Sequence, residues 1–254
     1  MPRPVEPFRF RQFSVAHDRS SMRVNTDAVL LGAWAPLPAS PERILDIGTG
    51  SGVIALMLAQ RCSEAKITAI DIDEASVSQA RENFLASPWP ERLAAENISL
   101  QELASRNPKS PKEPRQPSFD LIISNPPFFR DALRNPDPTR RQARHTDTLS
   151  FDELCSCSAA LLAPEGRLAL ILPADAEADI LACAVRYGLH PTHLTRFYSN
   201  AALPPKRILL ALKKSPPCRD GIPCRLSREP IPENLTLGSE EYRALCGDFY
   251  LGIQ

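Results

Sequence analysis

The strongest constraint on the fold is a cluster of three glycines, Gly48, Gly50 and Gly52, within five residues. Residues 43–48 (RILDIG) before it are typical of a buried strand, and residues 53–62 (VIALMLAQRC) after it carry the apolar face of a helix. A tight strand-to-helix turn favours glycine, because glycine tolerates positive φ and lets the backbone approach a ligand. The cluster therefore predicts the ligand-binding edge of an α/β sheet. A tight turn without a ligand is the alternative interpretation.

Strand-like and helix-like segments alternate along the rest of the chain. The expected strands are residues 66–71, 97–103, 119–125 and 166–173, the expected helices are 73–86, 149–163 and 175–188, and residues 194–199 and 206–214 are expected to close the sheet as an antiparallel pair. This alternation predicts an α/β fold with a mostly parallel, doubly wound sheet whose last strand is antiparallel.

Composition and pattern divide the chain into three parts. Residues 1–41 form a lead-in rich in proline and arginine, with a short helix expected at 26–34. Residues 42–214 form the core. Residues 215–254 are expected to form a C-terminal appendage packed on that core. We expect the lead-in to cover the site at the glycine turn.

Two acids accompany the glycine turn. Its spacing is G-x-G-x-G rather than the G-x-G-x-x-G of dinucleotide-binding folds, and Asp46 precedes it on the strand. That carboxylate would repel a pyrophosphate but tolerate or bind a cationic amino-acid group. Asp71 ends the next strand, where an acceptor for a ribose diol is expected, although it could equally cap the following helix. The pair indicates an adenosyl cofactor with an amino-acid end, S-adenosylmethionine.

The strand 119–125 ends in the turn Asn125-Pro126-Pro127-Phe128. Neither proline can donate a ladder hydrogen bond, so the turn is stiff and aims the Asn amide and nearby carbonyls out of the sheet edge. An exocyclic amine of a nucleobase is a poor nucleophile. Two carbonyl acceptors on its hydrogens would favour the pyramidal nitrogen that attacks a methyl group, and Phe128 would stack on a flipped base. A plain strand-end turn is the alternative.

These motifs resemble those of a known class of enzyme. Residues 46–52 (DIGTGSG), 69–73 (AIDID) and 123–129 (ISNPPFF) are similar to the motifs of Rossmann-like amino-methyltransferases that use S-adenosylmethionine. The lead-in at 12–34 (QFSVAHDRSSMRVNTDAVLLGAW) resembles the N-terminal signature of the bacterial tRNA1(Val) (adenine-N6)-methyltransferase family, and residues 203–214 (LPPKRILLALKK) resemble the end of its sheet.

The resemblance implies methyl transfer to the N6 amine of a flipped tRNA adenosine, at position 37 beside the anticodon of tRNA-Val. The implied cofactor residues are Asp46, Gly48 and Gly50 at the methionine end, Asp71 at the ribose, Ile72 and Glu102 at the adenine, and Arg23, Thr26 and Asp27 over the methionine end. Asn125, Pro126, Pro127 and Phe128 would hold the target base. Phe128 stands where the family usually has Tyr, a change that preserves stacking but removes any role for a phenol.

Three other functions compete with this one. A protein glutamine-N5 methyltransferase uses the same NPP turn, but those enzymes usually carry an extra N-terminal helical domain, and only about 40 residues precede the glycine turn here. Methylation of guanine N2 in ribosomal RNA is the second alternative function. A cofactor-binding scaffold without catalysis is the third.

The charges are balanced overall but unevenly placed. The chain has 30 basic and 30 acidic residues, yet residues 1–25, 106–117, 128–149 and 196–214 each carry a net positive charge. Together these segments predict a phosphate footprint for tRNA on one rim, and scattered solvated charges are the alternative. The expected contacts are Arg130, Arg140, Arg141, Arg144, Lys206 and Arg207.

Other sequence features argue against metal and membrane. The seven cysteines form no C-x-x-C pair and only four histidines are present, so no metal site is expected. The N-terminus lacks the apolar core of a signal peptide, and no stretch approaches the ~18 apolar residues of a membrane span. We expect a soluble, cytoplasmic monomer.

Overall fold

The computed structural model describes residues 5–20, 22–106, 118–126, 149–214 and 231–251. The strands are β1 (Phe8–Arg9), β2 (Ser14–Val15), β3 (Arg43–Ile47), β4 (Lys66–Asp71), β5 (Leu93–Asn97), β6 (Phe119–Ser124), β7 (Leu162–Pro173), β8 (Leu189–Tyr198), β9 (Arg207–Lys214) and β10 (Asn234–Thr236). The α-helices are α1 (Thr26–Trp34), α2 (Val53–Arg61), α3 (Glu74–Leu85), α4 (Leu100–Ser105), α6 (Phe151–Leu161), α7 (Glu177–Arg186) and α8 (Glu240–Cys246).

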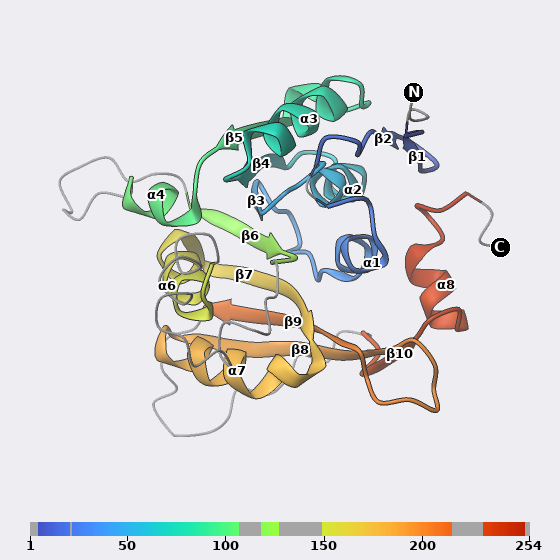
Figure 1. The fold of residues 1–254 in the computed structure, drawn as a ribbon. Coiled ribbons are helices and arrows are strands. Elements are labelled where there is room, and N and C mark those ends of the chain that lie inside the picture. Colours follow the sequence, from blue (N-terminus) through green and yellow to red (C-terminus); the bar gives the residue numbers. More distant parts are fainter. Residues whose placement is uncertain (1–4, 21, 107–117, 127–148, 215–230, 252–254) are drawn as a thin grey trace, which may run out of the picture.

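A single large sheet runs through the described part of the chain (Figure 1), with the strand order β10-β8-β9-β7-β6-β3-β4-β5. Its strands pair in parallel except β9, which is antiparallel to both β7 and β8. The predicted fold class, mostly parallel and doubly wound with an antiparallel closing strand, is confirmed.

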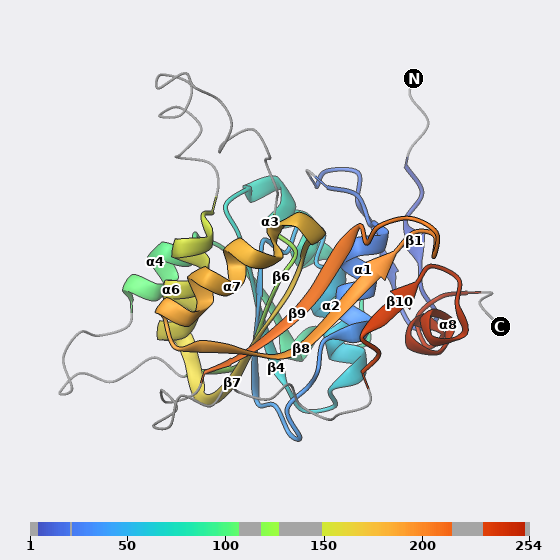
Figure 2. The same cartoon turned by 90° about the horizontal axis from the view of Figure 1, so that it is seen from below.

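Helices cover both faces of the sheet. Figure 2 shows α6 and α7 on one side of the strands and α1 and α2 on the other. Side chains of β6 alternate between the two resulting cores, with Leu121 and Ile123 on the α1–α2 side and Ile122 on the α6–α7 side. This explains the continuous apolar run in the sequence, since a strand covered on both faces has no polar side.

The strand predicted at 97–103 is wrong. β5 ends at Asn97, and α4 begins at Leu100. Ser99 caps this helix, because its side chain accepts a hydrogen bond from the backbone N–H of Glu102 at 3.1 Å. Leu100 and Leu103 are buried on one helix face. The alternation that suggested a strand is thus a strand end followed by a capped helix.

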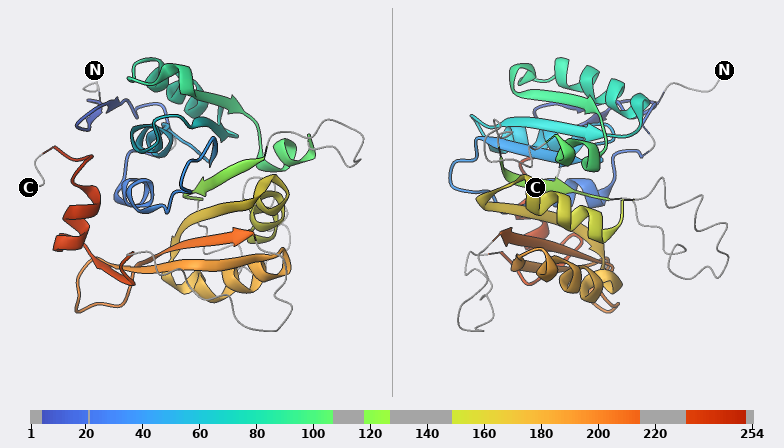
Figure 3. Two further views of the ribbon diagram at one scale, coloured as in Figure 1. Left: turned by 180° about the vertical axis from the view of Figure 1, so that it is seen from behind. Right: turned by 90° about the vertical axis from the view of Figure 1, so that its left-hand side faces the viewer.

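The two ends of the described chain meet beside α1. Phe10 forms an antiparallel bridge with Tyr250, and the N–H of Arg11 donates to the carbonyl of Phe249 at 2.9 Å. Figure 3 shows the β1–β2 pair and α8 on the same side of the molecule. β10, which had no counterpart in the sequence prediction, extends the sheet in parallel beside β8.

Within the described ranges, no helix is long and apolar enough to cross a membrane.

Candidate active site

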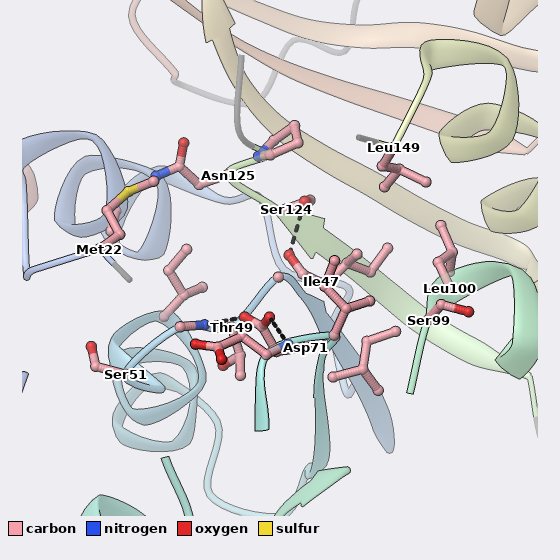
Figure 4. A pocket seen from close by; sticks show the side chains of 18 of the residues that line it. Met22, Ile47, Thr49, Ser51, Asp71, Ser99, Leu100, Ser124, Asn125 and Leu149 are labelled. Atoms are coloured by element: carbon pink, nitrogen blue, oxygen red, sulfur yellow. Dashed lines mark hydrogen bonds between the residues drawn. The ribbon is translucent and has the colours of Figure 1, made fainter. Parts of the chain in front are cut away.

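A cavity of about 540 Å³ opens where β3, β4 and β6 end. It combines the glycine turn, the end of β4, the start of α4 and the end of β6, which lie around it in Figure 4. Of the predicted site residues it is lined by Arg23, Gly48, Gly50, Asp71, Ile72, Asn125 and Pro126. The structure therefore brings together residues from positions 23 to 126 at one sheet edge.

All three turn glycines have left-handed backbone conformations. Their φ angles are 67° at Gly48, 54° at Gly50 and 83° at Gly52, a region that disfavours other residues. A Cβ on Gly52 would lie 2.5 Å from a ring carbon of Phe84, whereas a Cβ on Gly48 would meet nothing within 4 Å. Gly52 thus allows α3 to pack closely, and Gly48 presents bare backbone to the cavity.

Asp46 lies beneath the turn rather than in the cavity wall. Its side chain is fully buried, and Oδ2 accepts a hydrogen bond from Thr49 Oγ1 at 2.7 Å. Oδ1 has no hydrogen-bond partner among the described residues. Burial raises the pKa of Asp46 to about 7, against the Thr49 hydrogen bond and the nearby Ala55 N–H, which favour the charged form. A negative charge here is therefore held under the turn at a cost in solvation.

Asp71 braces the same turn from the end of β4. Its Oδ2 accepts from the Gly50 N–H at 2.9 Å, and its Oδ1 accepts from the Asp73 N–H at 3.0 Å. The cap of α3 is Asp73, which accepts from Ala75 and Ser76, so the alternative role of Asp71 as a helix cap is wrong. Each Asp71 oxygen retains acceptor capacity, and the carboxylate lines the cavity.

Beside Asp71, the side chain of Ile72 is 62% exposed and lines the cavity. Ile72 therefore gives the cavity mouth an apolar face next to the Asp71 carboxylate.

The end of β6 forms another wall. Ser124 is buried, and its Oγ donates to the carbonyl of Ile47 at 2.9 Å. Asn125 is half-buried and Pro126 is buried, and both line the cavity. Figure 4 shows Ser124 and Asn125 across the cavity from Thr49 and Asp71. The predicted Pro127 and Phe128 lie outside the described residues.

Besides Asp46, three other predicted cofactor residues do not line the cavity. Thr26 and Asp27 lie in the first turn of α1, and Asp27 Oδ2 accepts from Arg207 Nε at 2.7 Å. Glu102 lies on α4, with an oxygen 4.0 Å from Arg106 Nη2. The cavity reaches α4 through Ser99, Leu100 and Gln101 instead.

Further lining residues were missed by the sequence prediction. They include Met22 and Asn25 of the lead-in, Ser124 of β6, Leu149 just before α6 and Glu153 in its first turn. Asn25 caps α1 by accepting from the Ala28 N–H at 2.9 Å. The polar cap before a helix was an available signal for part of the site, since Asn25, Asp73 and Ser99, which cap α1, α3 and α4, all line the cavity.

Of the predicted RNA contacts, the structure describes two. Lys206 is exposed directly before β9, and Arg207 forms the ion pair with Asp27. Arg130, Arg140, Arg141 and Arg144 lie outside the described residues. In the part of the chain that the structure describes, no group of three or more His, Cys, Asp or Glu could hold a metal ion.

Known proteins are similar to this chain in sequence and in fold. Residues 27–181 match the family described as Methyltransferase small domain. A protein of Phocaeicola vulgatus named tRNA1(Val) (adenine(37)-N6)-methyltransferase is 47% identical over 255 residues, covering 100% of both chains. A protein of Parabacteroides distasonis with the same name is 43% identical, covering 96% of this chain and 97% of its own. A predicted O-methyltransferase from Agrobacterium tumefaciens shares the fold, with a TM-score of 0.61, 19% identity, and coverage of 88% of this chain and 96% of its own.

Proposed function

We propose that this chain, which belongs to the family of tRNA1(Val) (adenine(37)-N6)-methyltransferases within the Methyltransferase small domain proteins, transfers a methyl group from S-adenosylmethionine to the N6 amine of adenosine 37 in tRNA-Val. The observation that carries the proposal is one cavity lined by both the glycine turn and Asn125. A cofactor site and an amine-holding turn on one cavity are what methyl transfer requires.

The cavity residues fit S-adenosylmethionine. Its volume of about 540 Å³ lies in the range of small-molecule sites. Gly48 leaves open space where a side chain would stand, Asp71 offers carboxylate oxygens to a ribose diol, and Ile72 offers an apolar face to adenine. S-adenosylmethionine would supply an electrophilic methyl group on a sulfonium and leave as a neutral thioether.

Asp46 would act on the amino-acid end through the turn. Its Oδ1 is buried without a hydrogen-bond partner in the described residues, so the carboxylate is poorly solvated and its field is weakly screened. A cation above the turn would lower the free energy of the ionised Asp46 carboxylate. Asp46 therefore contributes attraction for an ammonium group without touching the cavity.

On the acceptor side, Asn125 would accept hydrogen bonds from the N–H groups of the adenine amine. Those bonds favour a pyramidal nitrogen and strengthen as positive charge develops on it. The amine loses its proton to water after or during transfer, so no strong base is required. Stacking by Phe128 and the role of Pro127 stay predictions.

The tRNA contacts are also part of this proposal. Lys206 is exposed on the described surface and remains a candidate for a phosphate contact. Arg130, Arg140, Arg141 and Arg144, the monomeric state and the cytoplasmic location stay predictions. The relatives' names favour adenine-N6 over the glutamine-N5 and guanine-N2 alternatives.

One experiment separates these substrates. The protein is incubated with methyl-labelled S-adenosylmethionine and, in separate reactions, total tRNA, ribosomal RNA or a release factor, and labelled tRNA is digested to nucleosides. We expect label in tRNA as N6-methyladenosine. Label found only in the release factor or in ribosomal RNA contradicts the proposal.

A further inference from the structure

One face of α3 carries three buried polar side chains, Ser76, Gln79 and Asn83. Their spacing of three and four residues aligns them along the helix. Burying polar groups is unfavourable unless they are hydrogen-bonded. The two amides, Gln79 and Asn83, are bonded to residues 16–20 of the lead-in, and Asn83 is bonded also to the glycine turn.

The Asn83 side-chain amide pairs with the backbone of the lead-in as a neighbouring strand would, through one acceptor and one donor. Its Oδ1 accepts from the Ala16 N–H at 2.9 Å, and its Nδ2 donates to the Ala16 carbonyl at 2.9 Å. The same Nδ2 donates to the Ser51 carbonyl at 2.8 Å. One amide therefore satisfies both backbone groups of a lead-in residue and joins that residue to the glycine turn.

Gln79 holds the next residues in the same way. Its Oε1 accepts from the N–H groups of Arg19 at 3.1 Å and Ser20 at 2.9 Å, and its Nε2 donates to Asp18 Oδ1 at 2.6 Å. The hydrogen bond from Gln79 holds the pKa of Asp18 below its usual range. Ser20 is thereby placed so close to the turn that a Cβ on Gly50 would lie 3.2 Å from its Oγ.

Residues 16–20 add no side chain to the apolar core, and Val24 is the one described hydrophobic residue between Val15 and Ala28 that packs against it. Val15 is fully buried and Ala28 is again buried, but every described residue between them is exposed or half-buried. Met22, Arg23 and Asn25, which line the cavity, follow directly after the bonded residues. The position of that cavity wall therefore depends on the two amides of α3 on one side and on the packing of Val24 on the other.

We propose that Gln79 and Asn83 are positioning residues for the cofactor: they clamp residues 16–20 across the glycine turn and so hold Met22 and Arg23 over the cavity. The inference rests on the proposed function, because it takes S-adenosylmethionine as the ligand. Releasing the clamp lowers the fraction of protein with a complete cavity wall, and apparent affinity falls by the same fraction.

The test uses Gln79→Glu, which keeps both backbone acceptors but sets a carboxylate against Asp18. In the double variant Gln79→Glu/Asp18→Asn, the amide introduced at position 18 can donate to the carboxylate introduced at position 79, so the pair is hydrogen-bonded again with the roles exchanged. Gln12→Glu makes the same chemical change at an exposed position of the lead-in and is the matched control. Dissociation constants for S-adenosylmethionine are measured by titration calorimetry, and kcat is measured at saturating cofactor.

We expect Gln79→Glu to raise the dissociation constant by about tenfold or more, the scale of an unsatisfied buried polar contact, with kcat changed by less than about twofold. The double variant should recover most of the affinity, and Gln12→Glu should match the wild type. Unchanged affinity in Gln79→Glu, or no recovery in the double variant, overturns the clamp.

Limited trypsin digestion of the cofactor-free protein tests the clamp independently of the proposed function. Cleavage after Arg19 and Arg23 should be faster in Gln79→Glu than in the wild type or the double variant. If the wild type binds no S-adenosylmethionine, the proposed function is contradicted. Faster cleavage in Gln79→Glu than in the wild type would still support the clamp in that case. If Gln79→Glu does not fold, Asp18→Ala is used instead, because it removes the acceptor of the Gln79 Nε2 bond by a change at an exposed residue. Cleavage of Asp18→Ala at the wild-type rate contradicts the clamp.

Discussion

Ser124 Oγ donates a hydrogen bond to the Ile47 carbonyl at 2.9 Å, with the serine fully buried. Ile47 is the last residue of β3, directly before the glycine turn, and Ser124 is the last residue of β6, directly before Asn125. The two residues are register partners in the sheet. The bond therefore joins the strand that ends in the cofactor turn to the strand that ends in the amine-holding turn.

Ser124→Ala removes this bond without adding volume. We expect kcat to fall by about tenfold, because small misplacements of reacting groups are expensive in rate, while the dissociation constant for S-adenosylmethionine stays within about twofold. Single-turnover kinetics and calorimetry measure the two quantities. Ser63→Ala, at an exposed serine far along the chain from either turn, is the control. A loss of cofactor affinity with kcat unchanged would show that the bond supports only the cofactor turn.

Asn125→Ala tests the amine-holding role. We expect methyl transfer to tRNA to fall by about 100-fold or more, the effect of removing one preorganised hydrogen-bonding group from a transition state. Cofactor affinity should stay nearly intact, because the glycine turn and Asp71 are untouched. Asn200→Ala, at an exposed asparagine between β8 and β9, controls for the chemical change. A parallel loss of cofactor binding would falsify the assigned role.

The glycine turn could be predicted from the sequence because its requirement is local: three left-handed positions lie between a strand and a helix. The start of α4 could not, because the residues 97–103 satisfy an alternating pattern over a few positions, and the Ser99 cap decides the outcome. Glu102, which the resemblance implied for the adenine, lies on this helix but does not line the cavity, which reaches α4 at Ser99, Leu100 and Gln101.

Contacts between distant segments were invisible in the sequence for a different reason. Arg207 was predicted to bind RNA, and its partner Asp27 stands 180 positions away. Gln79 and Asn83 are typical of the solvent face of an amphipathic helix, yet both are buried. Only the fold, by placing the lead-in across α3, turns these polar residues into internal hydrogen-bonding groups.

Alanine at Gly48 and at Gly52 should separate binding from stability. Gly52→Ala combines a left-handed φ with a Cβ 2.5 Å from Phe84, so we expect it to lower the free energy of unfolding by about 2–5 kcal/mol. Gly48→Ala carries only the backbone strain, about 1–2 kcal/mol. The added Cβ of Gly48→Ala would stand in the open space of the cavity. We therefore expect Gly48→Ala to lose more cofactor affinity than Gly52→Ala, relative to the stability that each variant loses. Urea unfolding and calorimetry give both values, and a larger stability loss at Gly48 would contradict this division.

Asp46→Asn should affect stability and binding in opposite directions as pH rises. The pKa of Asp46 is about 7 in the folded protein against an ordinary value of 3.8. The neutral acid is therefore favoured by folding, and its contribution to stability, present below pH 4, is lost as pH rises through 7. The full loss is on the order of 4 kcal/mol for three pKa units.

The amide cannot ionise, so the melting temperature of Asp46→Asn relative to the wild type should rise between pH 4 and pH 8. Over the same range wild-type affinity for S-adenosylmethionine should increase as the carboxylate ionises, and the variant should lack that increase. Thermal melts and calorimetry at pH 5, 6, 7 and 8 measure both trends, and a parallel pH profile for the two proteins would mean that Asp46 does not titrate under the turn.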